Sequence, residues 1–259
     1  MNKISKISDI IAYHEVFNDK SNRFDERFKK LPADIQEIIT QDKTVLVKHL
    51  SKELFKDMLI SELKKINPEY RVDEHSSQII DIFSLYFTKD TEFLKLDSSY
   101  SFSKGLLIMG KVGCGKTLLF KALSSLKRYF PSFDYYNSDL REPELKSITA
   151  YKIVESFAVK GFEIFEAGIY ISGSSFNANI TKSIYFIDDI GSENICTHYG
   201  STTNVLAEVF LRRYDLQSLT FCTTNLDPKN LKQFYGERIY SKMTEMMNFI
   251  IMEGTDRRR

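Results

Sequence analysis

Residues 110–117 read Gly-Lys-Val-Gly-Cys-Gly-Lys-Thr and fill every position of the pattern G-x-x-x-x-G-K-[S/T], the phosphate-binding P-loop. An apolar run at 106–109 precedes this stretch, and a segment with helical periodicity follows it at 118–128. The glycines therefore lie at a strand-to-helix turn, which is the context in which this pattern binds phosphate. A Gly-rich turn without a ligand is the alternative, and the flanking strand and helix make it the weaker one.

The residue types of the P-loop have distinct roles in binding a nucleoside triphosphate. Gly113 and Gly115 let successive N–H groups point at an anion, and the helix N-terminus adds its positive end. Lys116 is expected to reach the β- and γ-phosphates, and the Thr117 hydroxyl to ligate Mg²⁺. The predicted nucleotide-binding residues are Gly110, Lys111, Val112, Gly113, Cys114, Gly115, Lys116, Thr117 and Leu118.

The composition of the chain is that of an ordinary globular protein. Its 259 residues are 42% hydrophobic and 27% charged, with a formal net charge of +1, so any nucleic-acid surface must be a local patch. No apolar run approaches the roughly 18 residues of a membrane span, and the N-terminus has no signal-peptide core. The three cysteines are widely spaced, which argues against a disulfide framework or zinc site. These features predict a cytoplasmic protein without a membrane partner.

The hydrophobic pattern changes near residue 100. Residues 1 to about 90 carry amphipathic helical stretches, including a short apolar helix at 79–87, and a polar connector at 97–103 follows. From about 104 the pattern alternates between strand and helix, which predicts an α/β fold: a P-loop NTPase with a parallel sheet and helices on both faces, preceded by a mainly helical N-terminal region. We therefore expect a helical partner-binding region at 1–95 and an ATPase domain at 104–259.

Individual elements can be predicted after the P-loop helix. The next strand is expected at 133–136 or at 148–151, the two alternatives that the apolar pattern offers. The remaining predicted strands are 184–187, 219–223 and 249–252, and the predicted helices pass through 154–158, 205–214 and 231–247.

Two acids follow an apolar strand at 184–189, which reads Ile-Tyr-Phe-Ile-Asp-Asp and has the form of a Walker B strand. A strand end beside the P-loop would place the Asp188 carboxylate where it holds Mg²⁺. Asp189 is then the candidate general base for the attacking water. Glu193 is a rival for that role, because Ile190-Gly191-Ser192 can turn it back toward the site. The alternative is a plain strand end, which a complete P-loop upstream disfavours.

Three further polar residues are candidates for the nucleotide site. Asn225 follows the next apolar strand and is placed to orient the lytic water, the role called sensor 1, although it equally suits a helix cap. Arg238 is the candidate arginine finger, supplied across a subunit boundary, and a solvated helix-face charge is its alternative. Arg258, in the terminal Gly-x-Asp-x-Arg, is the candidate nucleotide-binding sensor 2, against a disordered basic tail.

Taken in order, these motifs resemble the DnaC/DnaI/IstB branch of the AAA+ ATPases, which are bacterial helicase loaders and transposition helpers. The resemblance covers 104–258, and Asp-Asp-x-Gly-x-Glu is its most specific part, because many other AAA+ proteins carry Asp-Glu there. It implies ATP and Mg²⁺ as ligands, Lys116 and Thr117 on phosphate and metal, Asp188 on the metal and Asp189 on water. Lys242 stands where loaders often carry a second arginine, so either Arg238 or Lys242 is the residue acting in trans.

The same resemblance implies a DNA-binding surface between the two Walker motifs. Aromatic and basic residues alternate there, and their helical spacing suits core packing equally well: Tyr151, Lys152, Phe157, Lys160, Phe162 and Phe165. The leading function is therefore an ATPase acting in DNA replication as a helicase loader, with single-stranded DNA, a replicative helicase and a homo-oligomer as its partners. The alternatives are a transposition helper on duplex DNA with a transposase, and a nucleotide-dependent assembly module without nucleic acid, which the net charge of +1 favours.

Overall fold

The computed structural model describes residues 51–126, 146–165, 169–170, 177–178, 185–194, 196–198, 201–254 and 256. These residues divide into two compact units. The first holds 51–93 and the last two residues of the helix that follows the P-loop, and the second holds the other described residues from 94 onward. The helices predicted before residue 51 lie outside the described residues, as does the alternative strand at 133–136.

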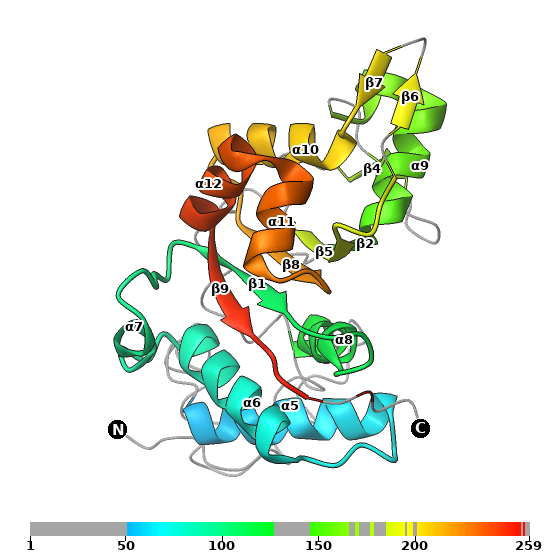
Figure 1. Ribbon diagram of the computed structural model, residues 1–259. Coiled ribbons are helices and arrows are strands. Elements are labelled where there is room, and N and C mark those ends of the chain that lie inside the picture. The colour runs from blue at the N-terminus through cyan, green and yellow to red at the C-terminus, as the bar shows by residue number, and fades with distance from the viewer. Residues whose placement is uncertain are drawn as a thin grey trace, which may run out of the picture. The chain divides into compact units, whose positions relative to one another are not determined.

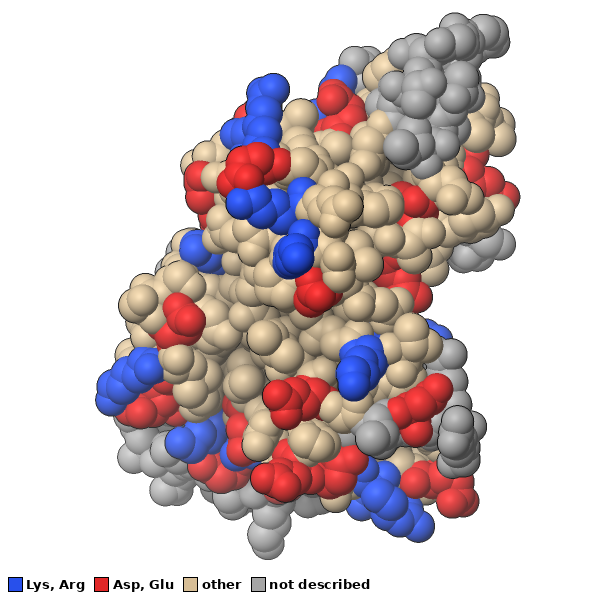
Figure 2. Space-filling model, viewed as in Figure 1, with Lys and Arg blue, Asp and Glu red and all other residues tan. Residues whose placement is uncertain are grey.

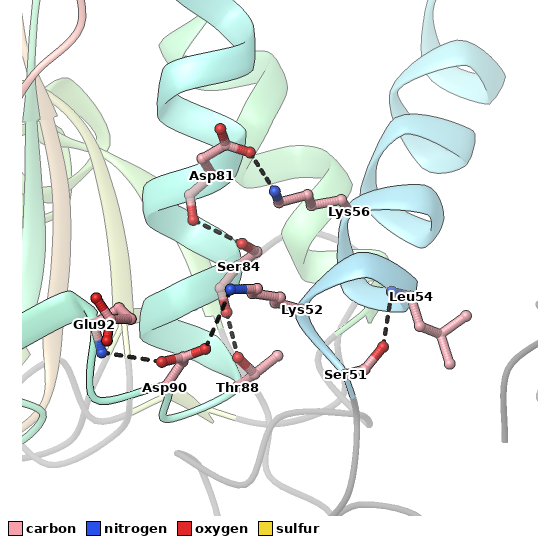
Figure 3. Close-up of polar contacts among 9 residues, drawn as sticks. All are labelled: Ser51, Lys52, Leu54, Lys56, Asp81, Ser84, Thr88, Asp90 and Glu92. Carbon is pink, nitrogen blue, oxygen red and sulfur yellow. Dashed lines mark hydrogen bonds and ion pairs between the residues drawn. The ribbon is translucent and has the colours of Figure 1, made fainter. Parts of the chain in front are cut away.

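Over residues 51–93 the first unit holds a pair of helices, α5 (Lys52–Ile66) and α6 (Glu74–Phe87), and α7 (Phe93–Leu96) begins at its boundary. Buried aromatic rings join the pair, with Phe55 and Phe87 stacked at 5.8 Å between ring centroids. Figure 3 shows polar contacts of the same two helices, including the ion pair between Lys56 and Asp81 at 2.6 Å. This ion pair is half-exposed and contributes little to the stability of the helix pair, so burial of apolar side chains is the main stabilising term. The short helix predicted at 79–87 is confirmed as the second half of α6.

The second unit contains a five-stranded sheet in which every neighbouring pair is parallel (Figure 1). Its strands lie in the order β2-β5-β8-β1-β9. The next strand of this sheet after the Walker B strand in sequence, β8, therefore lies between the P-loop strand and the Walker B strand. The bounds are β1 Gly105–Met109, β2 Lys146–Thr149, β5 Tyr185–Ile190, β8 Thr220–Thr224 and β9 Met247–Ile251.

Helices cover both faces of this sheet, as the sequence predicts (Figure 1). On one face, Phe120 of α8 (Lys116–Leu126) stacks on Phe186 of β5 at 4.1 Å between centroids. On the other face, Leu107, Ile187 and Cys222 pack in one core with residues of four helices. These are α9 Ala150–Lys160, α10 Val205–Asp215, α11 Pro228–Tyr235 and α12 Glu237–Met246.

Two close contacts fix the start of β8. Arg213, at the end of α10, is fully buried and donates to the Leu219 carbonyl at 2.6 Å and to the Thr220 hydroxyl at 2.9 Å. Gly105 lies so close to Thr220 that a Cβ at position 105 would come within 1.7 Å of the Thr220 carbonyl oxygen. Burial of the Arg213 guanidinium is tolerated because its hydrogen bonds to these acceptors are made. A methyl group added at position 105 would clash with the Thr220 carbonyl, so this position requires glycine.

The structure differs from the sequence prediction in five places. The predicted helix at 231–247 is two helices, because Gly236 between them has φ +82°, a conformation that interrupts a helix. The strand expected at 148–151 is β2, which ends at Thr149 where α9 is capped. The 3₁₀ helix η3 (Gly161–Phe165) and two short antiparallel pairs were not predicted: β3 Ile169–Tyr170 with β4 Asn177–Ala178, and β6 Cys196–His198 with β7 Ser201–Thr203.

No helix in the described part of the chain is both long enough and apolar enough to cross a membrane.

Candidate nucleotide-binding site

The P-loop connects β1 to α8 with two glycines in conformations that other residues rarely adopt. Gly113 has φ +81° and Gly115 has φ +107°. Gly113 is also crowded, because a Cβ there would lie 2.0 Å from an Asp256 carboxylate oxygen in the C-terminal segment. Backbone conformation therefore favours glycine at both positions, and the close approach of Asp256 adds to this at Gly113. The loop can turn its N–H groups inward as an anion-binding nest.

Lys116 is the buried cation of this loop. The side chain is 5% exposed, and its ammonium donates to the carbonyl oxygens of Gly110 at 2.7 Å and Lys111 at 2.9 Å. A third bond at 2.8 Å goes to the amide oxygen of Asn225, at the end of β8. A buried ammonium is stable only with such acceptors, so the three bonds hold the charge at the mouth of the P-loop.

Asn225 joins the P-loop to the Walker B strand. Its amide oxygen accepts from Lys116, and its amide nitrogen donates to Asp189 at 3.2 Å. Only one orientation of the amide satisfies both neighbours, because lysine has no acceptor and an ionised carboxylate has no donor. The structure thus brings together Lys116, Asn225 and Asp189, which are far apart in sequence.

The carboxylate of Asp188 lies beside the first turn of α8. One of its oxygens accepts from the Thr117 hydroxyl at 3.0 Å and from the Thr223 hydroxyl at 2.5 Å. Burial raises the pKa of Asp188, and the two hydroxyl bonds act in the opposite direction. A buried carboxylate next to a threonine hydroxyl is a set of hard oxygen ligands, which Mg²⁺ prefers.

Asp189 occupies an unusual backbone conformation at an irregular point of the sheet. Its φ is +57°, and the register between β5 and β8 shifts between Ile187 and Ile190. The Asp189 N–H donates to the Thr223 hydroxyl at 2.9 Å, which stabilises the turn. Such irregularities redirect side chains next to active sites, and here Asp188 and Asp189 face different partners.

Glu193 lies in a separate hydrogen-bonded group. It is 5% exposed, and its carboxylate accepts from the Gly191 N–H at 2.7 Å and from the Tyr235 hydroxyl. Burial raises the pKa of Glu193, and the bond from Tyr235 opposes that shift. Among the described residues, no hydrogen bond joins Glu193 to Lys116, Asn225 or Asp189, so the structure does not bring this candidate base into their network.

The remaining predicted residues are placed as follows. Arg238 is exposed in the first turn of α12, whereas the Lys242 ammonium lies 3.4 Å from the centroid of the Tyr214 ring. Arg258 lies outside the described residues. In the P-loop, Lys111 and Val112 are exposed, Cys114 is buried and Leu118 is half-buried.

The residues expected to bind DNA separate into two groups. Phe157 and Phe165 are buried in the core beside α10, 1% and 3% exposed. Tyr151 and Phe162 are 66% and 54% exposed, and Lys152 and Lys160 are exposed with them. The DNA-binding interpretation is therefore open only to the exposed group.

Sequence reasoning missed two polar contributors to the site. Thr223 bonds to both the Asp188 carboxylate and the Asp189 N–H, and a threonine in a buried parallel strand was the available signal. Tyr235 bonds to Glu193 from the far end of α11, and no local pattern in the sequence indicates that contact.

The fold and the site define a class of protein: a P-loop NTPase fold, as predicted, with the P-loop, Asp188 and Asn225 at one edge of a parallel sheet. The chain matches no protein-family model. It is similar to the replicative helicase loader DnaI of Bacillus subtilis (strain 168), at 26% identity over 187 residues, which make up 66% of this chain and 53% of that protein. The match therefore spans about half the length of the curated relative.

Two solved structures of helicase loaders are also similar. The crystal structure of the DnaC helicase loader matches with a TM-score of 0.44 at 15% identity, and the match covers 72% of this chain and 95% of the DnaC chain. The crystal structure of DnaI has a TM-score of 0.40 at 18% identity and covers 78% and 93%. The sequence similarity to DnaI confirms the predicted resemblance to the DnaC/DnaI branch.

The raised pKa of Asp188 generates a prediction about stability. A carboxyl group whose pKa is above its ordinary 3.8 in the folded chain binds its proton more tightly there than in the unfolded chain. Its contribution to the free energy of unfolding is therefore present at acidic pH and is lost as the pH rises through the folded pKa. We expect Asp188→Asn to gain stability relative to the wild type between about pH 4 and pH 7.

Thermal unfolding without divalent metal measures this difference. Asp227→Asn is the matched control, since Asp227 is exposed and caps α11, a role that asparagine also fills. If the stabilities of Asp188→Asn and the wild type changed with pH in parallel, burial of the ionised Asp188 carboxylate would not lower the free energy of unfolding, and the prediction would be wrong.

Proposed function

We propose that this chain binds and hydrolyses ATP and acts in DNA replication as a DnaC-like helicase loader. The observation that carries the proposal is the bonded series Lys116, Asn225 and Asp189, next to the pair Thr117 and Asp188. These groups supply a phosphate-binding cation, an amide beside the γ-phosphate position, a candidate base and a metal-binding pair. The similarity to the DnaI helicase loader supports the loader role.

The roles of the residues follow from their contacts. Lys116 exchanges its carbonyl acceptors for phosphate oxygens, and Thr117 and Asp188 offer adjacent oxygens to Mg²⁺. When bound there, the metal ion neutralises charge on the phosphate oxygens. Asn225 orients water and holds Asp189, whose carboxylate accepts the proton of that water. Asp189 is preferred over Glu193 because both Glu193 oxygens are already engaged by Gly191 and Tyr235.

The residue acting in trans is Arg238 in this proposal. Its guanidinium is exposed in the first turn of α12, and it makes no hydrogen bond or ion pair with any residue that the structure describes. Lys242 is already engaged over the Tyr214 ring, which makes it the poorer candidate. A finger supplied by a neighbour requires a homo-oligomer, and the isolated protomer is then nearly inactive.

The amide of Asn225 gives the first test. We expect Asn225→Ala to lower ATP hydrolysis by about 100-fold, since a positioned hydrogen-bonding group typically contributes that much to the rate. Affinity for an ATP analogue should fall by less than about tenfold, because one exposed hydrogen bond to a charged group is lost.

Asn230→Ala is the matched control, because this asparagine is exposed in α11 and, within the described part of the chain, its side chain bonds only to Asp227. Steady-state hydrolysis and analogue binding separate the two effects. Wild-type turnover by Asn225→Ala would remove the assigned role, and normal ATP binding by Lys116→Ala would refute the nucleotide site itself.

Single-stranded DNA is the proposed nucleic-acid partner, through the exposed side chains of α9 and η3. Tyr151 and Phe162 are exposed aromatic rings of the kind on which bases stack, beside the exposed Lys152 and Lys160. Lys152 also bonds to Glu155 at 2.7 Å, so phosphate binding there competes with an ion pair. In Figure 2, blue and red side chains are interspersed over the described part of the face in view, so that part of the surface carries no continuous basic stripe along which a DNA backbone could run.

Removing the two exposed rings tests this surface. We expect Tyr151→Ala with Phe162→Ala to weaken binding of single-stranded DNA at least tenfold, since each stacked base is worth about 1–3 kcal/mol. Val159→Ala, which truncates a side chain that is 78% exposed on the same helix, should leave binding unchanged. Fluorescence anisotropy over a range of salt concentrations is the measurement. A wild-type chain that binds no DNA would favour the assembly module, and preference for duplex would favour the transposition helper.

The helicase half of the proposal assigns partner binding to residues 1–95. We expect the full chain to capture a replicative helicase from its own cell, more strongly with ATP analogue than with ADP, and a chain lacking 1–95 to lose that capture. Analogue binding by the shortened chain is the control that its ATPase unit is folded. Capture that survives the deletion would contradict the assignment, and capture of a transposase would favour the alternative.

A further inference from the structure

Three hydrogen bonds close a small buried ring at Gly191, Glu193 and Tyr235. The Gly191 N–H donates to the Glu193 carboxylate at 2.7 Å and to the Tyr235 hydroxyl oxygen at 3.0 Å. The Tyr235 hydroxyl donates to the other Glu193 oxygen. Glu193 and Tyr235 are 5% and 6% exposed, so each bond satisfies a group that would be costly to bury alone.

One side of this ring belongs to the Walker B turn. Gly191 is two residues after Asp189 and has φ +83°. The turn is held from β8 as well, because the Thr224 hydroxyl donates to the Ile190 carbonyl at 2.7 Å. Leu226 packs so closely on Gly191 that a Cβ at position 191 would lie 2.5 Å from its methyl carbon. Leu226, two residues before α11, and Tyr235, the last residue of α11, therefore both contact Gly191.

The other side of the ring leads directly to the arginine-bearing helix. Tyr235 ends α11, Gly236 follows with φ +82°, and Arg238 lies in the first turn of α12. The start of α12 has no side-chain cap, so the backbone at Gly236 and the anchoring of Tyr235 hold its first turn, while Ile239 and Met243 hold the helix in the core. Phe210 of α10 packs edge-on against the Tyr235 ring at 5.7 Å between centroids and restricts its movement.

We propose that Glu193 and Tyr235 are positioning residues that couple the Walker B turn to α12. The nucleotide state of a subunit's own site thereby sets the direction of the Arg238 that it offers to a neighbour. This inference rests on the proposed ATPase function, and it explains why Glu193 is bonded to α11. Glu193 transmits the position of the turn and does not touch the reacting atoms.

The proposal predicts a defect in supplying the arginine finger to a neighbour, without a defect in accepting one. Tyr235→Phe retains the ring and its contact with Phe210 but removes the hydroxyl that holds Glu193. Such a subunit should bind and hydrolyse ATP when a neighbour supplies Arg238, and it should fail to supply its own. Tyr240→Phe is the matched control, because the Tyr240 hydroxyl, on α12, makes no hydrogen bond to any residue in the described part of the chain.

Mixing two variants in one oligomer separates the donation of the Arg238 finger from its acceptance. In a mixture with Arg238→Ala, Tyr235→Phe must donate the finger, and we expect hydrolysis at least about tenfold below the wild-type mixture, since a finger is worth roughly 10³–10⁵ in rate. In a mixture with excess Asn225→Ala, which retains ATP binding and so directs its own Arg238, it needs only to accept a finger, and hydrolysis should match the corresponding wild-type mixture. Tyr240→Phe should behave as wild type in both. A loss of equal size in both mixtures would indicate ordinary destabilisation and would overturn the proposal.

Hydrogen exchange supplies a readout that does not depend on turnover. With a non-hydrolysable ATP analogue and Mg²⁺, the amides of α12 should become protected in the wild type and in Tyr240→Phe. In Tyr235→Phe the P-loop amides should be protected as in the wild type, and those of α12 should not. Equal protection of α12 in Tyr235→Phe would refute the coupling. If the wild type shows no protection at the P-loop, or if Arg238→Ala hydrolyses ATP normally on its own, the proposed function fails instead.

Discussion

The parallel pairing of β8 with both β1 and β5 is the constraint on which the site depends. Parallel strands end at the same edge of a sheet, so this order brings the P-loop, the Walker B acids and Asn225 together from positions more than a hundred residues apart. Gly105 and the buried Arg213 serve the same purpose at the opposite end of β8. A shift of one residue in β8 would turn the Thr223 hydroxyl away from Asp188.

The site buries three charged side chains, and removing each of them from water costs free energy unless hydrogen bonds replace the water. Lys116, Asp188 and Glu193 are each less than a tenth exposed, and each is surrounded by hydrogen-bonding partners. Desolvation still dominates for the two acids, because burial raises the pKa of both. Stability and function are therefore opposed at this edge of the sheet, as is common where a protein must hold ligand charges ready.

The sequence predicts those parts of the fold that depend on local pattern. The strands β1, β5 and β8 and the helices α8, α9 and α10 have continuous apolar runs or helical periodicity, and each was expected near its observed place. The break at Gly236 was not foreseen, since one glycine within an amphipathic segment does not interrupt its periodicity. The bonds of Thr223 and Tyr235 were missed for another reason: they depend on which strands are neighbours and on where α11 ends. Local spacing carries neither kind of information.

The left-handed backbone at Asp189 restricts which amino acids the position accepts. Aspartate and asparagine adopt φ near +57° more readily than other residues with a side chain, because their short polar groups bond locally, whereas longer side chains do so rarely. Glutamate, whose side chain is one methylene longer, adopts this conformation less readily. In this chain the bulge between Ile187 and Ile190 selects the shorter acid, so the Asp-Asp pair is a conformational signature of the turn as well as a chemical one.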